Sequence, residues 1–229
     1  DSLFFDYYYI VLVIPALIIA LIAQVRVKST FQKYNGVLNR RQYTGAMVAR
    51  QILDANGLSN IRLERVRGEL SDHYDPRAGV IRLSDSTFDS TSVGAIGVAA
   101  HEVGHAIQYQ VGYLPIKIRS AIIPVTQLGS SLAIPIAILG LIMGMDLLVQ
   151  VGILLFCAVV VFQLITLPVE FNASRRAMET LSNDHILEGD ELIGARRVLS
   201  AAAMTYVASL IVAVANLLRL LALRNRNRR

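Results

Sequence analysis

Four long apolar runs dominate the pattern of hydrophobic and polar positions along the chain. They cover residues 7–23, 121–144, 147–167 and 201–223. Each run approaches or exceeds the roughly 20 apolar residues that a helix needs to cross a ~30 Å hydrocarbon layer. The first run is uninterrupted, so residues 1–25 are predicted to form an N-terminal transmembrane anchor.

The charges that flank the first run distinguish an anchor from a cleaved signal peptide. A signal peptide carries positive charge before its apolar stretch. Here Asp1 and Asp6 precede the run, and the first basic residues, Arg26 and Lys28, come after it. The sequence therefore predicts an uncleaved anchor whose N-terminus lies outside the cell.

The second and third apolar runs are separated by only Met145 and Asp146. Two helices with so short a connection run antiparallel, so residues 118–169 are expected to form a transmembrane hairpin. Basic residues lie near both ends of the hairpin and none lies in its two apolar runs. We therefore expect both ends on the cytoplasmic side and the tip outside.

The last run lies in the C-terminal segment, residues 200–229, and leaves two alternatives open. If it spans, the tail with Arg224 and Arg226 lies outside, against the positive-inside tendency. If it does not span, it packs on the protein or lies along the membrane interface. Arg219, near the end of this run, is expected to snorkel toward the membrane surface. Three or four transmembrane helices are therefore expected.

Composition and charge narrow the class of protein further. Hydrophobic residues make up 54% of the 229 residues and charged residues 17%, whereas charged residues reach about a quarter of a soluble domain. The net charge is +5, and the basic residues lie mostly between the apolar runs. This distribution indicates the orientation of the chain in a membrane rather than a nucleic-acid partner. With Cys157 as its one cysteine, the chain has no intramolecular disulfide and no cysteine-based zinc site.

The polar stretch, residues 26–117, is predicted to form a small cytoplasmic domain. Thr44 is suited to capping a helix over residues 44–56, because apolar residues recur there at helical spacing. Residues 61–66 and 80–83 are predicted to be short strands with turn residues between them. The domain is therefore expected to combine helices with a small β-hairpin or sheet.

The strongest chemical signal is a His-Glu-x-x-His motif in a helix that Thr91 or Ser92 can cap. His101 and His105 are four residues apart, so both imidazoles lie on one face of the helix and can point at one ion. This is the arrangement of zinc hydrolases, in which the glutamate, here Glu102, acts as general base. The motif predicts two zinc ligands and a base.

A third protein ligand must come from elsewhere, and the residues alone leave its identity open. Glu170 begins the cytoplasmic segment 170–199, and the hairpin returns it to the face where the motif lies; it is equally suited to being an ordinary interfacial charge. His185 with Asp184 could be a ligand and its orienting partner, or part of a helix cap. His73 is expected near the site at a strand end.

Five segments of the chain resemble the bacterial neutral zinc metallopeptidases of the YugP type, which are integral membrane proteins of about this length. The resemblance covers nearly the whole chain. The segments are FFDY at residues 4–7, AQVRVKSTF at 23–31, HYDP at 73–76, AAHEVGHAIQ at 99–108 and LPVEFNASRRA at 167–177.

A more distant likeness joins this pattern to the HtpX and CAAX prenyl proteases. It implies that Glu170, just past the hairpin, is the third zinc ligand. In that group an aspartate four residues later supports the site; Ser174 stands there here, with Asn172 or Ser174 itself as weak substitutes. The likeness also implies that the segment 74–83 takes the place of an edge strand that pairs with the substrate backbone; the alternative is an edge strand used only for packing.

The fold expected from these observations is a mainly α-helical membrane protein with a zincin-like α+β catalytic core on three to four transmembrane helices. The expected function is a zinc-dependent metalloendopeptidase at the cytoplasmic face of the bacterial plasma membrane, acting on peptides or membrane proteins. Four side chains are candidates for contacting the substrate or its transition state: His73, Tyr74, His185 and Arg175.

Two other functions compete with this one. A non-catalytic membrane scaffold or partner-binding subunit would use zinc only to tie the polar domain to the hairpin. A small transporter is poorly supported, because one buried arginine offers no paired ion pathway. The sequence leaves the oligomeric state and any protein partner undetermined.

Overall fold

The computed structural model describes residues 6–229, so Asp1 and the two phenylalanines of the 4–7 segment lie outside the described residues. The chain forms two compact units. The helical unit comprises Asp1–Gln24, Pro115–Pro168 and Met204–Arg229, and the α+β unit comprises Val25–Leu114 and Val169–Ala203.

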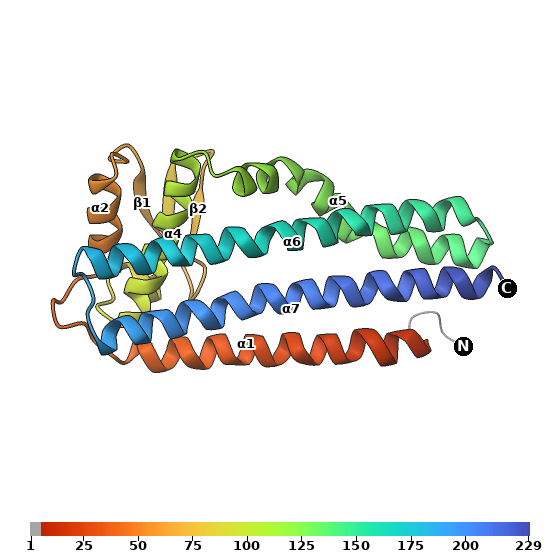
Figure 1. The fold of residues 1–229 in the computed structure, drawn as a ribbon, viewed down its shortest axis with the longest axis horizontal. Coiled ribbons are helices and arrows are strands. Elements are labelled where there is room, and N and C mark those ends of the chain that lie inside the picture. The colour runs from red at the N-terminus through yellow and green to blue at the C-terminus, as the bar shows by residue number, and fades with distance from the viewer. Residues whose placement is uncertain (1–5) are drawn as a thin grey trace. The chain divides into compact units, whose positions relative to one another are not determined.

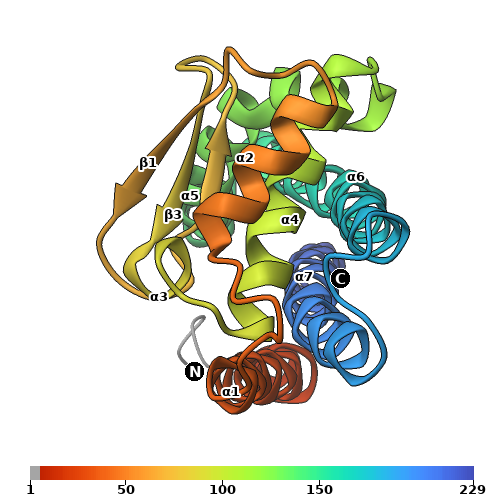
Figure 2. The same cartoon turned by 90° about the vertical axis from the view of Figure 1, so that its left-hand side faces the viewer.

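The elements follow one another along the chain from the red N-terminal end to the blue C-terminal end in Figure 1, and Figure 2 adds the labels of β3 and α3. In order they are a π-helical turn (Tyr9–Val13), α1 (Ile14–Asn35), α2 (Gly45–Ala55), β1 (Arg62–Val66), β2 (His73–Asp75), β3 (Val80–Ser84), α3 (Asp85–Phe88), α4 (Val93–Gln110), α5 (Leu114–Met143), α6 (Asp146–Asn183) and α7 (Asp190–Asn227).

Four helices of the described chain are long and apolar enough to cross a membrane, as judged by length and composition. They are Tyr9–Asn35, Leu114–Met143, Asp146–Asn183 and Asp190–Asn227. The last apolar run thus belongs to one continuous helix of 38 residues. The expected fold class, helical with membrane-spanning helices and a small sheet, is confirmed.

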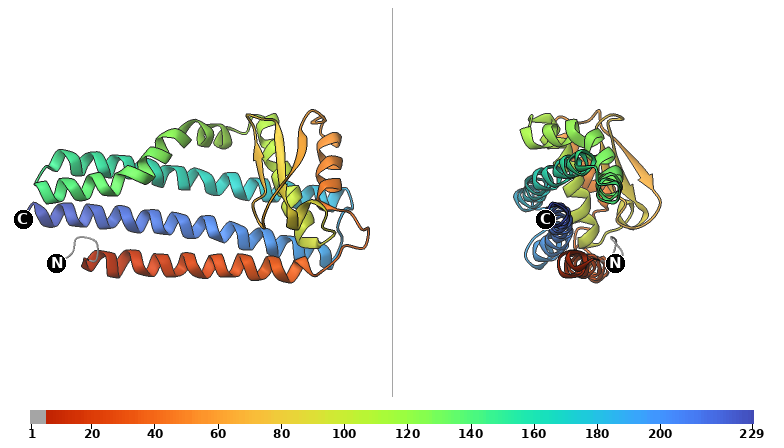
Figure 3. Two further views of the ribbon diagram at one scale, coloured as in Figure 1. Left: turned by 180° about the vertical axis from the view of Figure 1, so that it is seen from behind. Right: turned by 90° about the vertical axis from the view of Figure 1, so that its right-hand side faces the viewer.

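Small residues allow the helices of the helical unit to pack closely. A Cβ atom at Gly152 of α6 would lie 2.6 Å from the carbonyl oxygen of Ala133 in α5, so the hairpin depends on glycine there. Figure 3 shows these two helices side by side and antiparallel. The N-terminal helix packs on α7 through Val13, Ala16 and Ala215.

Arg219 does not snorkel, contrary to the sequence-based expectation. It is 3% exposed and forms a buried ion pair with Asp6, with its Nη2 2.8 Å from Oδ2 of the carboxylate. Farther along α7, Arg224 and Arg228 pair with Asp146 at the tip of the hairpin. The C-terminal end of α7 therefore lies at the same end of the helical unit as the hairpin tip.

The α+β unit contains a three-stranded sheet with the order β1-β3-β2. The first strand is parallel to β3, and β2 is antiparallel to it. From the sequence, the segment 74–83 is expected to be an open edge. This expectation is wrong for the residues in β3, because β3 is paired on both sides. Within this segment only β2 leaves an edge free.

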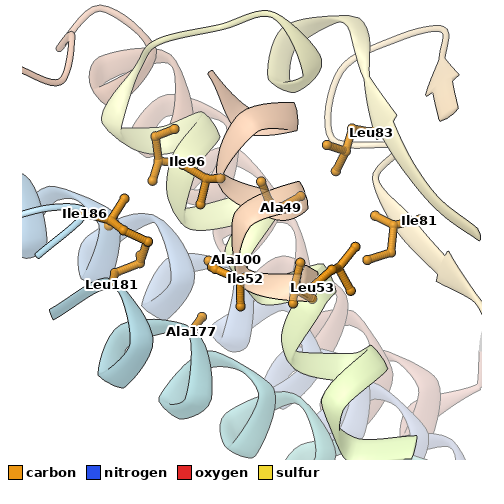
Figure 4. Packing of buried hydrophobic residues seen from close by; sticks show 14 of the residues in the cluster. Ala49, Ile52, Leu53, Ile81, Leu83, Ile96, Ala100, Ala177, Leu181 and Ile186 are labelled. Atoms are coloured by element: carbon orange, nitrogen blue, oxygen red, sulfur yellow. The ribbon is translucent and has the colours of Figure 1, made fainter. Parts of the chain in front are cut away.

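Two helices cover one face of this sheet, as Figure 2 shows for α2 and α4. Both begin as the sequence predicts: Thr44 accepts a hydrogen bond from the backbone N–H of Met47, and Ser92 accepts one from Ala95. Side chains from α2, β3, α4 and the end of α6 form the core between them, including Ile52, Ile81, Ile96 and Leu181 (Figure 4).

Candidate metal centre

The two motif histidines lie one turn apart on α4. Their ring centroids are 4.7 Å apart and the ring planes are nearly perpendicular, at 89°. The helix is buried along most of its length. This packing fixes the face on which both imidazoles stand.

Glu170 of α6 brings its carboxylate to both histidines. Its Oε2 lies 3.0 Å from Nε2 of His101, and its Oε1 lies 3.5 Å from Nε2 of His105. Two ligand atoms about 2.0 Å from a tetrahedral zinc ion are about 3.3 Å apart, between these two distances. The three ligand atoms all lie within 4.8 Å of one another, so the donor set fits zinc in type and spacing.

A glycine inside the motif permits this approach. A Cβ atom at Gly104 would lie 2.6 Å from the carbonyl oxygen of Ala173, closer than real Cβ contacts come. The backbones of α4 and α6 therefore meet at this point, three residues after Glu170. A larger residue at position 104 would meet the α6 backbone at Ala173.

Glu102 lies between the two histidines in the sequence and is 8% exposed. Burial raises the pKa of this carboxyl group, and the negative charges of Glu170 and Asp72 act in the same direction, whereas the neighbouring imidazoles oppose them. A carboxylate with a raised pKa binds a proton more readily. Such a group is suited to general acid–base work near neutral pH.

The other ring nitrogen of each histidine, Nδ1, also has a hydrogen-bond partner. Nδ1 of His101 lies 2.9 Å from Oγ of Ser174. Nδ1 of His105 lies 2.9 Å from Oε1 of Gln108. Partners of this kind orient metal-binding imidazoles.

The sequence reasoning missed Gln108. Its spacing was the available signal, because a residue three positions after His105 lies on the same helical face. The side chain is fully buried, and it links His105 to the turn of α6 that carries Glu170 through bonds to Val169 and Asn172.

The residues of β2 separate onto the two faces of the sheet, because successive side chains of a strand alternate. Tyr74 packs against the core of the α+β unit, and its ring stands 5.7 Å from that of Tyr109, one turn after His105. His73 lies on the other face, where its Nε2 is 3.3 Å from a guanidinium nitrogen of Arg82. Only Tyr74 of this pair therefore faces α4.

The remaining candidates lie on exposed positions. The side chain of His185 is 70% exposed and bonds to Glu188 in the connection between α6 and α7. Arg175 is exposed on α6, whereas its neighbour Arg176 donates to Asn172. The structure brings together His101, His105 and Glu170, and it does not bring His185 to them.

Comparison with known proteins gives two matches. The model of a family described as "Putative neutral zinc metallopeptidase" matches residues 9–225. The chain is also 47% identical over 211 residues to "Putative membrane protease YugP" of Bacillus subtilis strain 168, a match that covers 92% of this chain and 94% of the relative. No solved structure matches the chain significantly.

Proposed function

Because the chain belongs to the neutral zinc metallopeptidase family, we propose that it is a membrane-embedded zinc metalloendopeptidase in which His101, His105 and Glu170 hold the metal. The observation that carries this proposal is the convergence of these three side chains from two helices. Glu102 adds a buried carboxyl group to the same turn of α4.

Each side chain has a distinct part in the proposed hydrolysis. The two imidazoles and the Glu170 carboxylate bind zinc, which, when bound, lowers the pKa of a coordinated water to about 7. Glu102 accepts the proton from the attacking water and later donates it to the leaving amine. The raised pKa of Glu102 favours the first of these transfers and retention of the proton until the leaving amine takes it.

The free edge of β2 is the proposed docking strand for the substrate. An extended peptide can add to an open sheet edge through main-chain hydrogen bonds, which accept many sequences. Tyr74 stands in this strand on the face toward α4, so its side chain is the candidate for contact with the substrate or the transition state. Of the other three candidates, His73 lies on the opposite face of the sheet, and His185 and Arg175 are exposed.

The proposed location of the α+β unit is the cytoplasmic face of the bacterial plasma membrane. Basic residues follow directly after the apolar part of α1, as the positive-inside rule requires of a cytoplasmic segment. Exposed apolar side chains on α1, such as Leu17, Leu21 and Ile22, are suited to contact with lipid. Peptides and membrane proteins at this surface are the proposed substrates.

Three variants of the full-length protein test the proposal when zinc content and casein cleavage are measured together. Glu102→Gln should retain zinc and lose about 10²–10⁴-fold in turnover. Glu170→Ala should lose zinc and activity together. Glu179→Gln, an exposed glutamate on the same helix, is the matched control and should change neither.

Two results would contradict the proposal. Wild-type turnover by Glu102→Gln would support the non-catalytic scaffold, in which zinc has only a structural part. Full zinc content and activity in Glu170→Ala would show that the third ligand is another residue.

A further inference from the structure

Gln108 makes three hydrogen bonds in a fully buried position between α4 and α6. Its Oε1 lies 2.9 Å from Nδ1 of His105. Its Nε2 lies 2.8 Å from the carbonyl oxygen of Val169 and 3.0 Å from Oδ1 of Asn172. No part of the side chain is exposed to solvent, so these contacts alone satisfy it.

The partners of Gln108 fix the direction of every bond in this network. A carbonyl oxygen only accepts hydrogen bonds, so the atom of Gln108 that faces Val169 must be the amino nitrogen. Arg176 donates from Nε to Oδ1 of Asn172 over 2.8 Å, and an arginine only donates, so Oδ1 is also an acceptor. The remaining atom of Gln108, Oε1, must therefore accept a hydrogen bond from His105.

We propose that Gln108 is a positioning residue that holds His105 in the tautomer with its proton on Nδ1, which leaves Nε2 free to bind the metal. This inference rests on the proposed function. An imidazole needs an unprotonated nitrogen to act as a ligand, and the bond made by its other nitrogen selects which one that is. Oε1 of Gln108 accepts from His105, because its amino group is held by Val169 and by Asn172, whose Oδ1 also accepts from Arg176.

The same side chain also sets the position of Glu170. Its two amino-group contacts, Val169 and Asn172, stand on either side of Glu170 in α6. Gln108 therefore ties one metal ligand of α4 to the helical turn that supplies another. The partner of His101 is different in kind, because the hydroxyl of Ser174 can donate or accept and does not by itself select a tautomer.

Zinc affinity and histidine nitrogen spectra of the full-length protein test this proposal. Gln108→Met keeps the length of the side chain and removes all three hydrogen bonds, so zinc should bind about 10–100-fold more weakly. Gln110→Met, two residues farther along α4 at an exposed position, is the matched control and should bind zinc as the wild type does. Zinc binding is measured by competition with a chelator.

Nitrogen-15 labelling of histidine gives a readout that a merely structural role would not move. The chain has four histidines, so each ring can be resolved. In zinc-loaded wild type, His105 should show a hydrogen-bonded Nδ1–H and a metal-bound Nε2. In Gln108→Met the Nδ1 proton should exchange faster with water, while the spectrum of His73 stays unchanged.

Two substitutions at Asn172 protect the test against misfolding of the Gln108 variant. Asn172→Asp keeps an acceptor for Gln108 and should preserve zinc affinity, whereas Asn172→Leu removes it and should weaken binding. Wild-type affinity and an unchanged His105 spectrum in Gln108→Met would overturn the role of Gln108 alone. Absence of zinc binding by the wild type would overturn the proposed function itself, so the two failures are distinguishable.

Discussion

Replacing Gly104 by alanine tests whether close helix contact is what brings Glu170, the proposed third ligand, to the histidines. The added Cβ would lie 2.6 Å from the carbonyl oxygen of Ala173, about 0.8 Å short of the 3.4 Å at which ordinary contact begins. Overpacking of this kind costs about 1–3 kcal/mol of folding free energy. The α6 backbone beside Glu170 must move by a comparable distance, whereas metal–ligand distances tolerate only about 0.2 Å.

Gly104→Ala should therefore bind zinc at least about tenfold more weakly and melt several degrees lower than wild type. Chelator competition and thermal unfolding in detergent measure the two effects. Gly94→Ala on the same helix is the control, because its Cβ would meet backbone no closer than 3.5 Å and should be tolerated. Wild-type zinc affinity in Gly104→Ala, with the fold intact, would refute the argument.

Three further predictions concern other parts of the chain. Hydrogen bonds from a main-chain N–H and a guanidinium hold the pKa of Asp75 below its usual value, so the stability that this residue adds over Asp75→Asn should be present at neutral pH and vanish as pH falls through the lowered pKa. Melting curves at a series of pH values check this. Arg219→Met should lower the free energy of unfolding by about 3–5 kcal/mol, because it leaves Asp6 buried without its ion-pair partner. Adding Asp6→Asn should recover most of this loss. Equal stability of the single and double variants would contradict the pairing. In a cysteine-free background, a cysteine at Met145 should react with impermeant reagents in intact cells and one at Ser182 only after the membrane is opened; the reverse pattern would place the α+β unit outside.

Local sequence signals predicted the elements that carry the site. Thr44 and Ser92 cap their helices as their residue types indicate, and the four-residue spacing of His101 and His105 places both rings on one face. These features depend on interactions within a few residues of the chain. They can therefore be predicted from the sequence alone.

Contacts between distant segments were harder to predict. From the residues alone Glu170 could have been an interfacial charge, and the resemblance to known proteases was needed to favour a ligand role. Arg219 finds Asp6 across more than 200 positions of sequence, which no local pattern encodes. A strand residue such as His73 moves to the opposite face with a shift of one position, so its orientation depends on register.

X-ray absorption at the zinc edge of the purified full-length protein tests the central claim most directly. We expect two imidazole nitrogens at about 2.0 Å and a carboxylate oxygen at a similar distance in the wild type, and no bound zinc in Glu170→Ala. A zinc environment with one imidazole, or one that Glu170→Ala leaves unchanged, would contradict the convergence of His101, His105 and Glu170 on one ion.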